Sequence, residues 1–207
     1  VSTLNQTSTV SNPQGNDYKA IYVPNDSDIE GEANFDIQFS DLASNEGTPI
    51  TASTNNTKVI FDKTPPADFA VGLLTPTGGN QVDGMWNLTN TGMDIIIPVA
   101  NDTTLKNGTV QLYGKVGSNS FEVLGSISTI LSNEINANKI ISVSGTLIEG
   151  LTGFSEGQRI YIKAAMNDRP GNITEGSQSI TEILIDETPA SITPISILSS
   201  NNNTALA

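Results

Sequence analysis

Short runs in which hydrophobic and polar residues alternate recur along most of the chain. Alternation with a period of two is typical of strands that bury one face, and each run is bounded by Gly, Asn, Asp, Ser or Pro residues that favour turns. The first runs of this kind cover residues 17–23, 34–40 and 58–61. The pattern predicts an all-β fold without long helices.

A longer series of such runs lies between residues 66 and 190. The predicted strands are 69–74, 93–99, 109–116, 121–127, 139–143, 159–165 and 177–186, with a loop at 75–79 and a single helical turn within 130–137. About seven to nine short strands at this spacing suit two sheets packed face to face. The side chains expected to point into the core are Ile95, Ile97, Leu112, Val123, Ile141, Ile160, Ile162 and Ile183.

Two short motifs occur twice, at matching places. A hydrophobic run ends in Asp-x-Thr-Pro at 62–65 and again at 186–189, and Asp-x-x-x-Asn precedes it at 41–45 and at 168–172. Proline has no N–H to donate, so it ends the strand ladder at each of these places. Two matched landmarks at similar separations indicate tandem repeats with a junction at each Asp-x-Thr-Pro.

The two junctions divide the chain into three units. Residues 1–65 are expected to be the C-terminal part of one repeat, residues 66–190 a complete repeat, and residues 191–207 the first strand of a following repeat. A unit of about 125 residues is long enough to bury a core of its own. Three or four strands cannot close a sandwich, so the core of the first unit should be partly open.

Charge and composition exclude several classes of function. With 22 acidic and 9 basic residues the net charge is −13, so nucleic acid and anionic membranes are poor partners and cations are better ones. The chain has no His and no Cys, which removes disulfides, imidazole and thiolate catalysis and the usual zinc ligands. No run approaches the roughly 18 apolar residues of a membrane span. We therefore expect neither an enzyme nor a membrane-inserted protein.

The repeated motifs carry a family resemblance. The stretches DLASNEGTPITASTNNTKVIFDKTPP (41–66) and NDRPGNITEGSQSITEILIDETPA (167–190) resemble the closing halves of bacterial immunoglobulin-like repeats, which have a D-x-A-G-N-like turn and a terminal V-D-x-T-x-P strand. The run GMWNLTNTGMDIIIPVANDTTLKNGTVQLYGKV (84–116) resembles a longer variety of these repeats in giant surface adhesins, including gliding-motility adhesins of Bacteroidota. The chain departs from the family pattern at Ser44 and at Arg169-Pro170, but both copies keep the Asp and the Asn.

The resemblance implies immunoglobulin-like β-sandwich repeats in tandem, forming a stalk or spacer segment of a secreted or surface-anchored bacterial adhesin. Such a segment would be extracellular, would contact neighbouring repeats of the same chain, and would leave surface glycans or proteins to other domains. One alternative is a carbohydrate- or protein-binding β-sandwich module. A second is a strand-exchanging filament or surface-layer subunit, whose open first unit accepts a strand from another copy.

Aromatic residues bear on the sugar-binding alternative. The chain has 6 Phe, 4 Tyr and 1 Trp. Trp86 is expected to pack at a loop or sheet edge rather than to stack on a sugar. Tyr113 and Tyr161 alternate with apolar neighbours and are interpreted as ordinary sheet residues. The sequence therefore favours the stalk over a sugar-binding module.

A calcium site is predicted at the first junction. In an immunoglobulin-like sandwich the last strand leaves at the end opposite to the entrance, whereas the loops before the last strand and after the second strand lie at the entrance. The side chains of Asp62, Asp102, Asp168 and Asn172 should therefore converge, and calcium prefers about six to eight oxygen ligands. By the same logic Asp41, Asn45 and Asp186 belong to neighbouring junctions and should be empty or weakly occupied. The alternative is that all these residues only stabilise turns.

Overall fold

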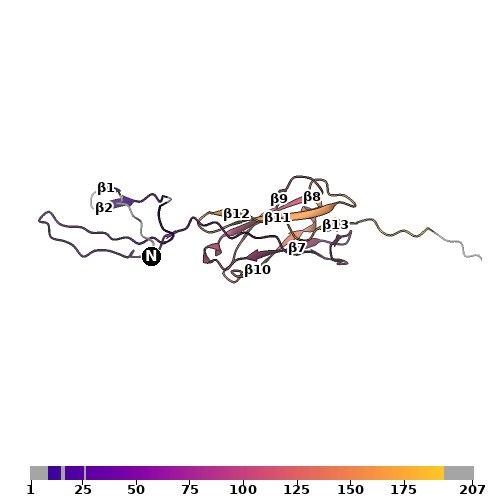
Figure 1. The fold of residues 1–207 in the computed structure, drawn as a ribbon, viewed down its shortest axis with the longest axis horizontal. Coiled ribbons are helices and arrows are strands. Elements are labelled where there is room, and N and C mark those ends of the chain that lie inside the picture. Colours follow the sequence, from indigo (N-terminus) through magenta and orange to yellow (C-terminus); the bar gives the residue numbers. More distant parts are fainter. Residues whose placement is uncertain (1–8, 15–16, 26, 194–207) are drawn as a thin grey trace, which may run out of the picture.

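The computed structural model describes residues 9–14, 17–25 and 27–193. Its regular structure consists almost entirely of β-strands, which confirms the predicted all-β class. Figure 1 shows two parts that follow one another along the long axis and meet near residues 62–66. The strand predicted at the start of a third unit, residues 192–198, falls almost wholly outside the described residues.

The first part contains two small antiparallel sheets. β1 (Thr9–Gln14) pairs with β2 (Asp17–Ile21), and β3 (Gly31–Glu32) pairs with β4 (Ile60–Phe61). The strand predicted at 34–40 is reduced to isolated bridges, which join Ile37 to Ile50 and Ser40 to Glu46. No described hydrophobic side chain before Pro66 is buried, so this part has no core of its own.

The second part contains two larger sheets. The smaller of them has the strand order β10-β7-β5, and the larger has the order β6-β13-β11-β8-β9 with β12 beside β11. Neighbouring strands are antiparallel except for β6 and β13, which are parallel. The strands are β5 (Leu74–Thr77), β6 (Met85–Trp86), β7 (Gly92–Val99), β8 (Thr109–Val116), β9 (Glu122–Thr129), β10 (Ala137–Ser144), β11 (Arg159–Asn167), β12 (Ile173–Glu175) and β13 (Ile183–Ile185).

One hydrophobic cluster joins the two sheets. It contains buried side chains from both, among them Ile95 and Ile97 of β7, Leu112 of β8, and Ile160 and Ile162 of β11. Along β8 every second residue is buried, as the period of two predicts. Of the other predicted core residues, Ile183 is fully buried and Ile141 is partly buried against the cluster.

The prediction for Val123 is wrong, because its side chain is 63% exposed and that of the next residue, Leu124, is buried. Val123 lies opposite Tyr113 on the outward face of the sheet, and Leu124 lies opposite the inward Leu112. The register of β9 against β8 shifts beyond this point, next to Gly125 with a φ of 70°. Extra residues in one strand break the period of two, so alternation alone could not give the correct face.

The first strand of the second part lies later than predicted. Residues 69–71 pair with the segment around Ser177 beside the larger sheet. From Gly72 onward the chain hydrogen-bonds to β7 of the smaller sheet, and it continues there as β5. β5 includes Pro76, which the sequence placed in a loop. A proline is tolerated there because β5 is an edge strand, and a residue on an edge strand can lack a backbone N–H without leaving an acceptor of the sheet unpaired.

The helical turn predicted within 130–137 is also wrong, since this segment forms hydrogen-bonded turns. Short helices occur elsewhere, as η1 (Thr103–Leu105) and α1 (Gly145–Glu149). The turns bring Glu134 to Lys139, which occupies an inward position of β10 and is only 5% exposed. Its ammonium donates to the Glu134 carboxylate (3.0 Å) and to the carbonyl of Thr129 (2.9 Å), and these bonds offset its lost hydration.

The shifted phase of β9 can be tested with a matched pair of substitutions. Leu124→Ala should destabilise the second part by roughly 2–5 kcal/mol, because it leaves a cavity in the core. Val123→Ala should change its stability by no more than about 0.5 kcal/mol, because Val123 faces solvent. Urea unfolding followed by the fluorescence of Trp86, the single tryptophan of the chain, measures both. Equal losses in the two variants would contradict the register described here.

Candidate functional site at the joint

The joint between the two parts is the linker that contains the first Asp-x-Thr-Pro motif. Oδ1 of Asp62 accepts a hydrogen bond from the backbone N of Thr64 (3.0 Å). The carbonyl oxygen of Asp62 accepts another from Nδ2 of Asn172 (3.2 Å), and the carbonyl oxygen of Pro66 accepts one from the hydroxyl of Thr174. Side chains of the second part therefore hold the linker at both of its ends.

The first part holds the same linker through Glu30. Its carboxylate accepts hydrogen bonds from the hydroxyl of Thr64 (2.7 Å) and the backbone N of Lys63 (3.0 Å). The bond from Thr64, more than the one from Lys63, lowers the pKa of Glu30 below its ordinary value. The ionised Glu30 carboxylate therefore stabilises the joint fully above the ordinary pKa of a glutamate. This stabilisation is lost as the pH falls through the lowered pKa of Glu30 and the group is protonated. Glu30 was not predicted as a site residue, because nothing distinguishes it from the acidic residues around it.

The loop between β11 and β12 is closed by Asp168, which is only 3% exposed. Its Oδ1 accepts hydrogen bonds from the backbone N of Gly171 and of Asn172, both at 2.7 Å. Its Oδ2 accepts one from Nδ2 of Asn172 (2.9 Å). The amide of Asn172 thus donates to Asp168 within its own loop and to Asp62 across the joint.

The first Asp-x-x-x-Asn motif forms the same loop. Oδ1 of Asp41 accepts from the backbone N of Ala43 and of Asn45 (2.9 and 2.8 Å), and Oδ2 accepts from Nδ2 of Asn45 (2.8 Å). In both loops the Asp N–H also donates to the carbonyl of the Asn, at 3.0 Å. The side-chain bond from Asn45 is the main cause of the lowered pKa of Asp41. Unlike Asp168, Asp41 is exposed to solvent.

Asp102 lies in a neighbouring loop, and its carboxylate accepts hydrogen bonds from that same loop. It is the N-cap of η1, and its Oδ1 accepts from the backbone N and the hydroxyl of Thr104, at 2.8 and 2.6 Å. The carbonyl of Thr104 accepts from the backbone N of Arg169 (3.0 Å), so this loop and the Asp168 loop are adjacent. The structure brings Asn172 to Asp62, whereas the Asp102 carboxylate remains within its own loop.

The predicted calcium ligands take part in hydrogen bonds of their own turns in this structure. Among the described residues, no three His, Cys, Asp or Glu side chains form a group that could hold a metal ion. Asp168 already accepts three hydrogen bonds, so few of its lone pairs are left for a cation. The predicted outer positions Asp41 and Asn45 are paired with each other, and Asp186 lies exposed at the end of β13. Calcium binding at the joint therefore stays a prediction without a preformed site.

A groove beside the joint adds positive charge to this region. It lies between the last strand of the first part and the loops of the second part, and its lining includes Lys58, Lys106 and Arg169. Cationic side chains oppose the binding of a second cation nearby. Lys58 is paired with Glu32 (2.9 Å), so Lys106 and Arg169 supply the positive charge that would weaken cation binding nearby.

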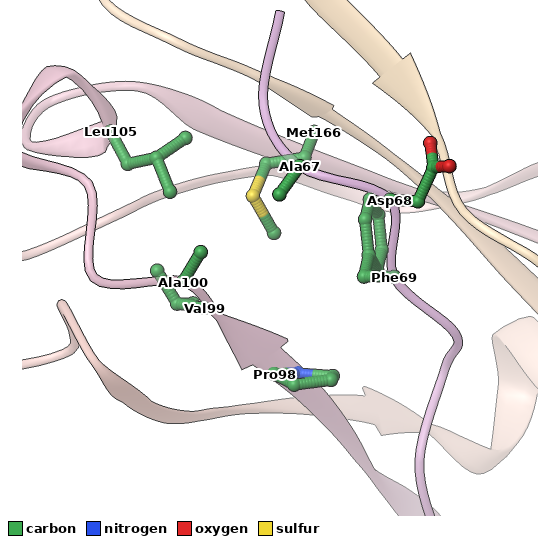
Figure 2. A pocket seen from close by; sticks show the side chains of 8 residues that line it. All are labelled: Ala67, Asp68, Phe69, Pro98, Val99, Ala100, Leu105 and Met166. Atoms are coloured by element: carbon green, nitrogen blue, oxygen red, sulfur yellow. The ribbon is translucent and has the colours of Figure 1, made fainter.

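A small apolar pocket opens at the same end of the second part (Figure 2). It has a volume of about 260 Å³ and is lined by Ala67, Asp68, Phe69, Pro98, Val99, Ala100, Leu105 and Met166. Figure 2 shows Phe69, Leu105 and Met166 converging from three elements, while the carboxylate of Asp68 points away from the space between them. The pocket is smaller than ordinary ligand sites, which begin near 300 Å³, and its size suits one apolar side chain.

Trp86 does not lie on a binding surface. Its side chain is fully buried, and its ring meets that of Phe154 edge to face, with 6.4 Å between the centroids and 88° between the planes. Its indole nitrogen has no hydrogen-bond partner. A sugar could reach this ring only if the core opened, so Trp86 is a core residue.

No protein-family model matches the chain, and no curated protein is similar to it in sequence. In the part of the chain that the structure describes, no helix has the length and hydrophobicity needed to cross a membrane. Function must therefore be inferred from the motifs, the joint and the surfaces of the chain itself.

The Asp168 loop should be essential for the order of the second part. Asp168→Ala removes the acceptor of three hydrogen bonds in a buried loop, and we expect it to lower the unfolding free energy of this part by about 2–3 kcal/mol. The matched control is Asp41→Ala, which opens the same loop in the first part. Urea unfolding followed by Trp86 fluorescence should be unchanged in the control. A loss of similar size in both variants would contradict this assignment.

The predicted calcium site is tested by thermal unfolding in millimolar calcium and in excess chelator. Asp168 accepts three hydrogen bonds, and Oδ1 of Asp62 and of Asp102 is bonded within its own turn, so we expect the same unfolding temperature in both. A higher temperature in calcium that is abolished by Asp62→Ala would instead establish the site. A calcium effect that survives Asp62→Ala would place a metal elsewhere in the chain.

Proposed function

We propose that this chain is a structural stalk or spacer segment of an extracellular bacterial surface adhesin. It would consist of immunoglobulin-like β-sandwich repeats in tandem, act without enzymatic activity, and hold a distal binding region away from the cell. Its immediate partners would be neighbouring repeats of the same chain. A role in gliding motility would follow from the resemblance to gliding adhesins.

The observation that carries this proposal is the repetition of one loop geometry in two parts that lie end to end. In both loops the Asp accepts hydrogen bonds from the backbone N and the side-chain amide of the Asn, and its own N–H donates to the Asn carbonyl. The loops differ between these two residues, where Ala43 N donates to Asp41 in one and Gly171 N, one position later in the motif, donates to Asp168 in the other. Figure 1 shows the two parts in succession along the long axis. Glu30 of the first part and Asn172 of the second part both hydrogen-bond to the linker. A spacer requires similar units that follow one another and a linker that is fixed by hydrogen bonds to both of its neighbours.

The strand order of the second part supports an immunoglobulin-like sandwich. Lettered in chain order, the strands are A (β5), B (β7), C (β8), C′ (β9), E (β10), F (β11) and G (β13), with β6 and β12 as additions. The two sheets then have the orders E-B-A and G-F-C-C′. Immunoglobulin domains place A, B and E in one sheet and C, F and G in the other. One buried cluster between the sheets is also the expected core.

The first part supports the view that residues 1–65 belong to an incomplete repeat. Phe35, Ile37, Phe39 and Ile50 are between 43% and 54% exposed on the long hairpin that precedes the joint. A second sheet would normally cover such a row of apolar side chains. The hairpin also carries the Asp41 loop at the place where the complete repeat carries the Asp168 loop.

The strand-exchanging filament remains the second candidate. It is favoured by the apolar hairpin at one end of the molecule and by the extended segment that follows β13 at the other, where Ile192 is 88% exposed. A strand donated by another copy could cover the hairpin. Such head-to-tail contacts would not close and would produce filaments.

A stalk should be rod-shaped and should depend on the contacts at the joint. We expect small-angle X-ray scattering of the chain to give an elongated profile. The double variant Asn172→Ala, Thr174→Val removes both side-chain bonds from the second part to the linker and should broaden the distribution of end-to-end distances. Ser118→Ala is the control and should scatter like the wild type, because Ser118 is exposed in the turn between β8 and β9, at the opposite end of β8 from the Asp168 loop.

Two outcomes would redirect the proposal. A compact wild-type profile with the two parts side by side would rule out a stalk. Concentration-dependent assembly in sedimentation velocity, lost when Ile37 and Phe39 are replaced by Ser, would favour the strand-exchanging filament. A monomer at all concentrations would exclude that second candidate.

A further inference from the structure

The outward face of the larger sheet carries an alternating set of tyrosines and lysines. Tyr161 of β11 lies directly opposite Lys115 of β8, and Lys163 of β11 lies directly opposite Tyr113 of β8. Successive positions on one face are two residues apart, so the four side chains form a square in which like residues stand on the diagonals. Phe121, just before β9, adds a third ring beside this square.

The aromatic rings hold the two ammonium groups on this face. Nζ of Lys115 lies 4.8 Å from the ring centroid of Phe121 and 5.1 Å from that of Tyr161. Nζ of Lys163 lies 5.2 Å from Phe121 and 5.4 Å from Tyr113. These distances are within the range of cation–π attraction, about 6 Å. The ammonium groups of Lys115 and Lys163 are thereby held near the ring of Phe121.

The acidic groups of the chain do not fully neutralise this face. Lys163 pairs with Glu175 at 3.0 Å, and Arg159, further along β11, pairs with Glu182. Lys115 forms no ion pair with any described residue. Three of the 9 basic residues of a chain with net charge −13 therefore lie on one face, and one of them is uncompensated.

The side chains that define this face are partly exposed in the described structure. The rings of Phe121, Tyr113 and Tyr161 are half-buried, and Val123 beside them is 63% exposed. A hydrogen bond with Glu182 raises the pKa of the Tyr161 phenol above its ordinary value. A partner would meet the exposed parts of these rings and the ammonium groups side by side.

We propose that this face, defined by Tyr113, Lys115, Phe121, Tyr161 and Lys163, binds an acidic polysaccharide of the uronic acid type. Each sugar of such a polymer offers an apolar C–H face to an aromatic ring and a carboxylate to an ammonium group, which matches the alternation on the sheet. A flat sheet face also suits an extended polymer better than a compact ligand. The carboxylates of an acidic peptide could pair with the lysines, but they are carried on flexible side chains that offer no rigid apolar face to the aromatic rings. This binding goes beyond the spacer role and does not depend on it.

The test measures binding of the whole chain to immobilised polygalacturonate by biolayer interferometry. Dextran serves as the neutral polymer and poly-L-glutamate as the acidic peptide, and all buffers contain chelator so that calcium cannot bridge protein and polymer. We expect binding to polygalacturonate that weakens as salt is raised, and no binding to dextran. Lys115→Met and Lys163→Met should each weaken it about tenfold, which corresponds to one lost charge-assisted contact.

The matched control is Lys19→Met, which removes one exposed positive charge from β2 in the first part. It should change the affinity by less than about twofold, and Lys115→Arg should retain most of the binding. Equal losses in Lys19→Met and Lys115→Met would show a nonspecific charge effect and overturn the proposal. No binding to polygalacturonate, or stronger binding to poly-L-glutamate, would overturn it as well, the latter in favour of an acidic protein partner.

Discussion

The carboxylate of Asp168 connects the order of the second part with its attachment to the first. It is buried and accepts three hydrogen bonds, so it satisfies two backbone N–H groups of its loop and fixes the amide of Asn172. Only in that orientation does the second amide hydrogen of Asn172 point to the carbonyl of Asp62. Asp168 closes its own loop and, through Asn172, also helps to fix the position of the linker that leads from the first part.

The same loop has different surroundings in the two parts, and this difference explains how they contribute to the joint. Around Asp168 the loop continues β11, whose inward residues belong to the shared core, so the loop is held by the whole sheet. Around Asp41 no hydrophobic side chain is buried, and the loop depends on its own hydrogen bonds. The second part is thus a rigid support, and the first part is held mainly where Glu30 and the linker meet.

Periodicity identified strands where each has one buried and one exposed face, and β8 was predicted with its observed bounds. It failed where other constraints act. Extra residues near Gly125 invert the phase of β9, an edge position lets Pro76 stay in a strand, and the turn with Glu134 allows Lys139 to face inward. For the joint, strand order could indicate which loops meet. It could not show that Asp102 and Asp168 use their oxygen atoms within their own turns, because that depends on local backbone geometry.

The way the chain enters and leaves the second part has a mechanical consequence. Residues 69–71 run parallel to the segment from Ser177 to Ile180, and three backbone hydrogen bonds join them. Tension applied to the two ends of this part pulls the paired segments in opposite directions along their own axes. Parallel neighbours loaded in this way must slide, so their hydrogen bonds resist together instead of opening one after another. This pairing therefore opposes extension of the second part along its length.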